Sequence, residues 1–135
     1  MADFFNDAQN LLESCENIEV ASVDEQGYPR VCVVTKLMSS GFDKIYFSTG
    51  ASGTKTRHFN SNQKASVCYH DNKDSVTLVG KVEIVEDMEL KQQIWKDWLC
   101  SHFKDGVNDS EFCLLKFKAS EATFWIDGEF STHKV

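Results

Sequence analysis

The sequence predicts a mainly β domain with helices, in which about six or seven short strands form an antiparallel barrel. The apolar runs are short, rich in valine, isoleucine and aromatic residues, and bounded by turns that contain glycine, proline, asparagine or aspartate. Successive runs follow one another across such turns, as in hairpins, and do not alternate regularly with helices, which disfavours a doubly wound sheet. This number of short strands favours a barrel over an open sheet.

The first half of the chain is predicted to contain two helices and the first strands. Apolar residues recur at helical spacing over 3–15, and a short helix is expected over 54–60. Turns at Gly27 and Gly41 separate the strands of this half. Alternating or valine-rich apolar runs predict these strands at 18–23, 30–38 and 44–49.

The second half is predicted to hold the remaining strands and the longest helix. Gly80 interrupts a long apolar run, where a β-bulge or a close approach of two backbones is expected. A wide apolar stripe predicts one continuous helix over 87–103, followed by a loop over 104–110. The tail after Asp127 is polar. The predicted strands of this half span 65–70, 75–85, 112–117 and 122–126.

Length and charge limit the class of protein. The 135 residues predict a single domain over 1–135, and 41% hydrophobic residues are enough to fill a core without a metal or a disulfide. The net charge of −7 argues against nucleic acid and against an anionic membrane surface as partners. A small anionic ligand stays compatible with this charge, because it needs only a local basic group. No apolar run approaches the length that spans a membrane.

Cysteine and histidine usage predicts a cytoplasmic protein without a metal site. The five cysteines are odd in number, widely spaced and lack a C-x-x-C pair, so buried free thiols in a reducing compartment are expected. The N-terminus lacks the apolar core of a signal peptide. None of the four histidines has another ligand at metal-binding spacing, and each is expected at the surface.

The segment from Tyr46 to Lys55, YFSTGASGTK, is the candidate ligand site. An apolar run ends in a Ser/Thr/Gly loop that leads into the basic first turns of a helix, and this arrangement suits a phosphate group. The same composition is also typical of an ordinary solvated turn, so both interpretations stay open. Arg30 and Lys36 lie six residues apart on one predicted strand face and would add positive charge.

Several segments in order resemble the pyridoxamine 5′-phosphate oxidase-like FMN-binding split-barrel superfamily, and in particular its short bacterial general-stress-protein branch. These segments span 27–30, 45–49, 52–55, 62–67, 79–83, 106–109 and 122–125, with Asp87, Ile94, Trp95 and Trp98 between 79–83 and 106–109. The resemblance implies a six-stranded antiparallel split barrel that works as a homodimer with FMN at the subunit interface. It also implies the cofactor-binding residues, which are Arg30, Val31, Lys36, Ser48, Thr49, Ser52, Thr54, Lys55, Ser75 and Trp125. Among these, Lys55 is implied to bind the phosphate.

The implied function is an FMN-binding oxidoreductase-like protein that exchanges electrons with a small-molecule donor or acceptor. The oxidases carry an arginine where this chain has Thr54, and their substrate-phosphate motif has no counterpart here, so oxidation of pyridoxamine phosphate is not expected. No side chain stands out as a catalytic acid or base. The alternative is a flavin-binding module without turnover, serving sensing or transport. A barrel for haem, with His70 as the candidate ligand, for a deazaflavin, or for nitroimidazole reduction also stays open.

Overall fold

The computed structural model describes residues 4–135 as one antiparallel β-structure with helices at its ends, so Asp3, the expected start of the first helix, lies outside the described residues. The helices are α1 (Phe5–Ser14), α2 (Thr54–Ser61) and α3 (Met88–Ile94), and two short 3-10 helices are η1 (Asp97–Ser101) and η2 (Gly106–Asn108). The strands are β1 (Asn17–Val23), β2 (Pro29–Ser39), β3 (Ile45–Gly50), β4 (Lys64–His70), β5 (Ser75–Val85), β6 (Phe112–Ile126) and β7 (Glu129–Lys134).

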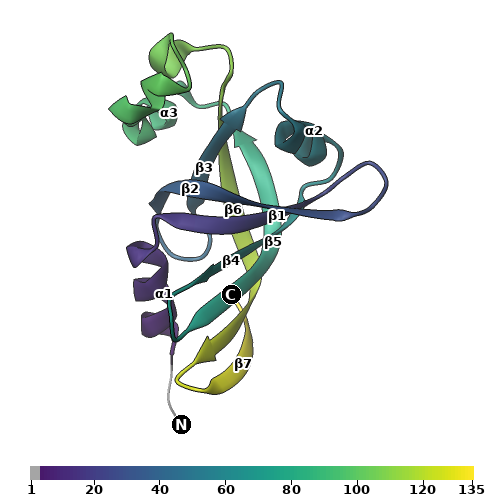
Figure 1. Cartoon of the computed structure of the whole chain (residues 1–135), viewed down its shortest axis with the longest axis vertical. Helices are drawn as coiled ribbons and strands as arrows, with labels where there is room; N and C mark the ends of the chain where they lie inside the picture. Colours follow the sequence, from purple (N-terminus) through teal and green to yellow (C-terminus); the bar gives the residue numbers. More distant parts are fainter. Residues whose placement is uncertain (1–3) are drawn as a thin grey trace.

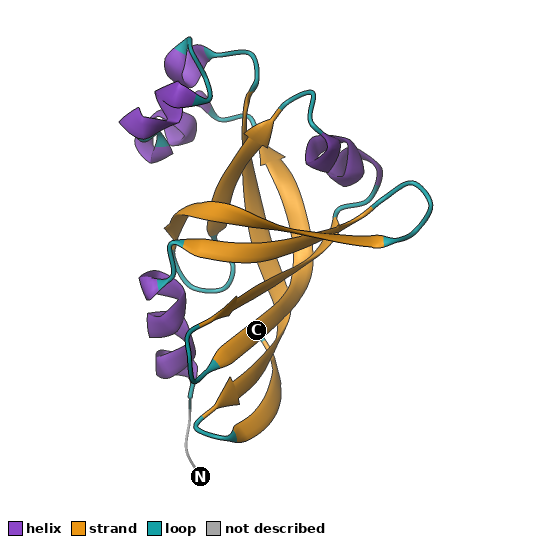
Figure 2. Cartoon of the chain, in the orientation of Figure 1, coloured by secondary structure: helices purple, strands orange, loops and turns teal. Residues whose placement is uncertain are grey.

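Six of these strands close into a barrel. The sheet order is β3-β2-β1-β4-β5-β6-β7, and an additional pairing of β3 with β6 joins the two sides, which leaves β7 outside the closed ring. Every pairing is antiparallel. Figures 1 and 2 show α2 and α3 near one end of the barrel and the β6–β7 hairpin at the opposite end. The predicted six-stranded antiparallel barrel is therefore confirmed.

Alternation along the strands builds the barrel core. On β1 and β4, for example, every second side chain is buried, because successive side chains of a strand point to opposite faces. Val20, Val67 and Leu78 meet inside, and α1 closes one side of the barrel with Ala8 and Leu12. A second apolar cluster lies under α3 and η1 and contains Leu37, Tyr46, Ile94, Leu99, Phe103, Phe112 and Leu114.

The helix predicted over 87–103 is wrong in its second half. Helix α3 ends at Ile94, the backbone is extended at Trp95 and Lys96, and the 3-10 helix η1 follows. The break lets Trp95 pack edge-on against Phe112 at 5.0 Å, while Trp98 turns outward and is 48% exposed. One continuous helix predicted both indoles on a single apolar stripe, whereas the barrel offers a packing surface to only one of them.

The end of the chain also differs from the prediction. The two strands expected at 112–117 and 122–126 form the single strand β6, because the polar residues between them face outward without ending the strand. The tail after Asp127 is not irregular but forms β7. Asp127 and Gly128 both have positive φ, which is the geometry of a two-residue hairpin turn. The sequence did not indicate β7 as a strand, because Phe130 is its only large apolar residue.

The expected irregularity at Gly80 is confirmed. The register of β5 and β6 shifts between Val79 and Gly80, so that Val79 pairs with Glu121 while Gly80 pairs with Ala119. Ser120 is the extra residue of this bulge, and its hydroxyl donates to the carbonyl of Val79 at 3.2 Å. Within the part of the chain that is described, no helix is long and apolar enough to cross a membrane.

Candidate functional site

The loop after β3 is folded back by backbone and hydroxyl bonds. The amide of Gly53 and the hydroxyl of Thr56 both donate to the carbonyl of Gly50, at 2.9 and 2.7 Å. These bonds turn the chain sharply into α2, so that Lys55 lies in the first turn of this helix. Thr54 is exposed at the first position of α2. The predicted strand, loop and helix of the candidate phosphate site are thus present in this order.

Glu111 holds the middle of this loop. Its Oε2 accepts hydrogen bonds from the amide of Ser52 at 3.1 Å and from the hydroxyl of Ser52 at 2.8 Å. The amide of Ala51 also donates to the carbonyl of Glu111 at 2.9 Å. A carboxylate of the chain itself therefore uses the donors of Ser52, and a phosphate at Ser52 would have to displace it.

Lys55 points toward β1, where it ends a chain of three polar side chains. Its ammonium donates to the hydroxyl of Ser22 at 3.4 Å, and this hydroxyl lies 2.8 Å from Nδ1 of His58. The Ser22 hydroxyl accepts from the ammonium, and the direction of its bond to Nδ1 depends on the imidazole tautomer. Both Ser22 and His58 are buried. The expectation that every histidine lies at the surface is wrong for His58, because this side of α2 packs onto the barrel together with Phe59.

Arg30 lies beside this group on the same hairpin. It pairs with Ser22 across β1 and β2, and its guanidinium contacts Oδ2 of Asp24 at 3.2 Å. Oδ1 of Asp24 accepts the amides of Gln26 and Tyr28, both at 2.9 Å. Burial alone would raise the pKa of Asp24, but the two amides and the guanidinium outweigh it and hold this pKa below its usual value.

Asp24→Asn is expected to reduce the loss of stability in acid. Because the pKa of Asp24 is lowered in the folded state, its stabilising contribution is present above the ordinary aspartate pKa and is lost as the pH falls through the folded value. The free energy of unfolding of the native protein should therefore fall more steeply than that of the variant below about pH 4. Urea unfolding at pH 7, 5, 4 and 3 measures this. The exposed Asp97→Asn serves as the control, and parallel curves for D24N and the native protein would contradict the prediction.

Lys36 lies away from Lys55 and is bound to the end of α1. Its ammonium donates to the carbonyl of Leu12 at the end of α1, and burial lowers the pKa of this lysine. Arg30 and Lys36 thus lie on one strand, but only Arg30 is at the Lys55 end of it.

Ser48 and Thr49 line a pocket between the end of β3 and η1, here called the β3–η1 pocket, with a volume of ≈ 490 Å³. The facing wall carries Trp98 and His102, whose rings are in edge-to-face contact at 6.4 Å. The remaining lining residues are Thr35, Gly50, Leu99, Phe103 and Glu111. No local sequence pattern indicates His102 or Glu111 as site residues, because their proximity to the end of β3 depends on the break after α3 and on the pairing of β3 with β6.

Ser75 and Trp125 lie at the other end of the barrel. They pair with each other across β5 and β6, and the ring of Trp125 contacts that of Phe130 of β7 in a tilted arrangement, with 4.4 Å between ring centres. The length of β4 separates this end from the end next to α2, which is about 20 Å of extended strand. A single chain therefore does not bring Ser75 and Trp125 to Lys55, and Figure 1 shows α2 and the β6–β7 hairpin at opposite ends of the barrel.

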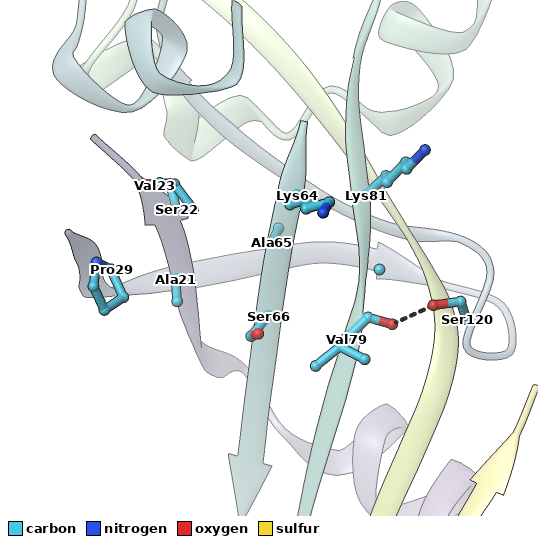
Figure 3. A pocket seen from close by; sticks show the side chains of 11 residues that line it. Ala21, Ser22, Val23, Pro29, Lys64, Ala65, Ser66, Val79, Lys81 and Ser120 are labelled. Carbon is cyan, nitrogen blue, oxygen red and sulfur yellow. Dashed lines mark hydrogen bonds between the residues drawn. The ribbon is translucent and has the colours of Figure 1, made fainter. Parts of the chain in front are cut away.

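The outer face of the barrel between these ends carries a row of small, mostly apolar side chains, with Lys64 and Lys81 near it. Val31, Ala21, Ser66 and Val79 pair in one row across β2, β1, β4 and β5. Val31 is 68% exposed and Val33, next on the same face, is 64% exposed. Figure 3 shows a hollow on this face, with Ser66 and Val79 on neighbouring strands, and its volume is ≈ 400 Å³.

The cysteines and His70, the candidate haem ligand, are not arranged as a metal site in the described part of the chain. All five cysteines are free, but only Cys113 is buried, which corrects the expectation that they are buried as a group. His70 lies on the outer face, with Nε2 3.3 Å from the carboxylate of Glu19. Over residues 4–135, no cluster of three or more histidine, cysteine, aspartate or glutamate side chains is arranged to hold a metal ion.

The fold and these sites define a closed antiparallel barrel with polar groups for a small ligand at its α2 end and aromatic residues at the other. The family described as pyridoxamine 5′-phosphate oxidase like matches residues 34–134, and the chain belongs to this family. The comparison with curated proteins returned no match.

Solved structures agree with this assignment. A Clostridium acetobutylicum protein related to general stress protein 26 of Bacillus subtilis, of the pyridoxinephosphate oxidase family, is 26% identical, with 98% of this chain and 94% of that chain covered and a TM-score of 0.86. General stress protein 26 from Bacillus anthracis is 18% identical, with coverages of 96% and 98% and a TM-score of 0.81. A heme binding protein from Mycobacterium smegmatis has the same fold at 16% identity, with 99% and 59% covered and a TM-score of 0.80. The family and the general-stress-protein likeness indicated by the sequence are confirmed.

Proposed function

We propose that this chain binds FMN and acts as a flavin-dependent oxidoreductase, with a small molecule as electron donor or acceptor. The observation that carries the proposal is the position of Lys55 and Arg30 at one end of the β1–β2 hairpin, on either side of Ser22. A phosphate dianion at this end would receive charge-assisted hydrogen bonds from both cations. Lys55 makes no ion pair among the described residues, and Arg30 retains guanidinium donors beyond its bond to Asp24.

The residues around the proposed flavin would bind and orient it. When bound, FMN supplies the redox chemistry, and the protein supplies position and electrostatics. Ser22 and His58 hold Lys55 in place, while the hydroxyls of Ser48 and Thr49 at the end of β3 suit the polyhydroxyl chain of the cofactor. The missing substrate-phosphate motif is the reason why we do not propose oxidation of pyridoxamine phosphate.

The proposed site requires a homodimer. Ser75 and Trp125 are too far from Lys55 in one chain, so a flavin that contacts both sets lies between two copies. The exposed side chains of Val31 and Val33 on the outer face of β2 support such an interface, because apolar side chains of this exposure are stabilised by burial. A cytoplasmic location belongs to the same proposal, since five free cysteines suit a reducing compartment.

A flavin-binding module without turnover is the second candidate. Glu111 favours it, because its carboxylate uses the donors of Ser52 and places negative charge beside the loop. Thr54 supplies no charge where the oxidases have an arginine, which leaves the phosphate with one bidentate donor fewer. Both features weaken retention of FMN and suit a protein that exchanges or senses it.

Lys55→Ala is expected to weaken FMN binding about 10- to 100-fold, because one charge-assisted bond to the phosphate is worth about 1.5–3 kcal/mol. The affinity is measured by titrating flavin-free protein and following flavin fluorescence. Lys73→Ala, which removes an exposed lysine in the β4–β5 turn, is the matched control and should bind as the native protein does. Equal affinities of the K55A variant and the native protein would remove Lys55 from the phosphate site.

The absorbance spectrum of the purified protein tests the proposal as a whole. Flavin bands that remain with the protein after excess FMN is removed would support the cofactor, and their bleaching by a nicotinamide donor would support an oxidoreductase. Bound flavin that no donor reduces would favour the module without turnover. Absence of retained flavin, together with an unchanged melting temperature in its presence, would overturn both candidates.

A further inference from the structure

The β3–η1 pocket has a charge opposite to that of the Lys55 end of the barrel. Glu111 is the only residue of fixed charge in its lining, and no lysine or arginine contributes to the lining among the described residues. The carboxylate of Glu111 has no ion-pair partner in the described part of the chain, and Oε2 is fixed by its two bonds to Ser52. Oε1 has no hydrogen bond within residues 4–135, so the group keeps both its charge and a free acceptor.

Neighbouring lysines do not cancel this charge. Lys91 lies over the ring of Phe112, 5.3 Å from its centre, and does not line the pocket. Lys36 is bound to the end of α1. It also lines a second hollow whose fixed charges balance, since the charged residues there are Lys36, Lys96, Glu13 and Glu16. The β3–η1 pocket therefore keeps the negative charge of Glu111.

Two aromatic side chains line the same pocket as this carboxylate. The break after α3 turns the indole of Trp98 outward, where it lines the pocket next to the imidazole of His102. Leu99 and Phe103 add apolar lining, and Ser48, which pairs with Leu114 on the η1 side of β3, adds a hydroxyl. A volume of ≈ 490 Å³ is in the range of pockets that hold small ligands. An indole face attracts cations, and this attraction adds to that of the carboxylate.

We propose that the β3–η1 pocket is a binding site for small aromatic cations, with Glu111 selecting the charge and Trp98 the aromatic ring. Small aromatic acids are disfavoured, because they would place a second negative charge beside the carboxylate of Glu111. As a substrate pocket this site rests on the proposed oxidoreductase function, but the binding preference itself depends only on residues of this pocket.

Three probes of similar size test this preference, namely protonated benzylamine, benzyl alcohol and benzoate. Each is titrated into flavin-free protein at low salt and pH 7, and binding is followed by the NMR signal of the Trp98 indole N–H, identified by its loss in Trp98→Phe. We expect benzylammonium to bind at least about tenfold more tightly than benzoate, with benzyl alcohol between them. Benzoate binding as tightly as benzylammonium would overturn the proposal.

Two variants separate charge from shape. Glu111→Gln keeps an acceptor for Ser52 and is expected to reduce the preference for benzylammonium over benzoate about tenfold, whereas the exposed Glu121→Gln should leave it unchanged. Trp98→Leu should weaken benzylammonium and benzyl alcohol, and because Trp98 is half exposed, this variant is expected to fold; its binding is read from the signals of Leu99 and His102. An unchanged preference in E111Q, or unchanged affinities in W98L, would contradict the assignment.

The test is independent of FMN. Lys55→Ala should abolish or weaken flavin binding without altering the preference among the three probes. If the native protein binds no FMN but prefers benzylammonium in a manner that depends on Glu111, the proposed function fails and this site stands. If FMN binds and the preference is absent, the site fails and the proposed function stands.

Discussion

Gly80→Ala is expected to lower the free energy of unfolding by about 3 kcal/mol. A Cβ atom at this position would overlap the carbonyl oxygen of Lys118 and lie 2.8 Å from Cα of Ala119. Both are backbone atoms of β6, so no flexible side chain can move aside. Because β5 and β6 share the longest pairing in the barrel, a shift at the bulge would disturb the strand pairing on both sides of it.

Urea unfolding followed by tryptophan fluorescence measures this effect, and Gly27→Ala is its matched control. Gly27 has a φ of +86°, but a Cβ added there would have no neighbouring atom within 4 Å, so its replacement introduces backbone strain without a clash. The control should lose only about 1–2 kcal/mol. Equal losses in the two variants would show that close approach of β5 and β6 does not determine the effect at Gly80.

Val33→Asp is expected to convert the proposed dimer to a monomer. Val33 is 64% exposed on the outer face of β2, and a carboxylate there would be desolvated in the interface next to Glu19, its neighbour across β1 and β2. Since the proposed flavin site needs Ser75 and Trp125 of a second copy, FMN affinity should fall together with dimerisation. Light scattering after size exclusion measures the first effect, and flavin titration measures the second.

Met88→Asp is the control for the Val33 variant. Met88 is also exposed, but it begins α3, away from the outer face of β2. This variant should remain dimeric and bind FMN as the native protein does. A native protein that is monomeric in solution would contradict the dimer directly, and a V33D variant that remains dimeric would show that the interface lies on another face.

Local sequence patterns predicted most of the barrel. Alternation identified β1, valine enrichment identified β2, and the position of Gly80 identified the bulge, because each of these signals comes from residues adjacent in the chain. The helix after β5 was predicted as one element since periodicity records apolar residues but not the surface available to them. Trp95 packs on Phe112 of the barrel, whereas the ring of Trp98 contacts His102 of its own segment, and the helix ends at Ile94, before both.

The candidate site likewise has features that the sequence predicts and contacts that only the fold creates. The strand, loop and helix around Lys55, and the basic residues near it, followed from the order of residues along the chain. Their partners depended on the folded arrangement, because Lys55 and Ser22 are 33 residues apart, Ser22 and His58 are 36 apart, and Ser52 and Glu111 are 59 apart. Strand pairing brings such residues together, and no local pattern records it. For this physical reason the loop was visible in the sequence, whereas the carboxylate that holds it and the pocket beside it were not.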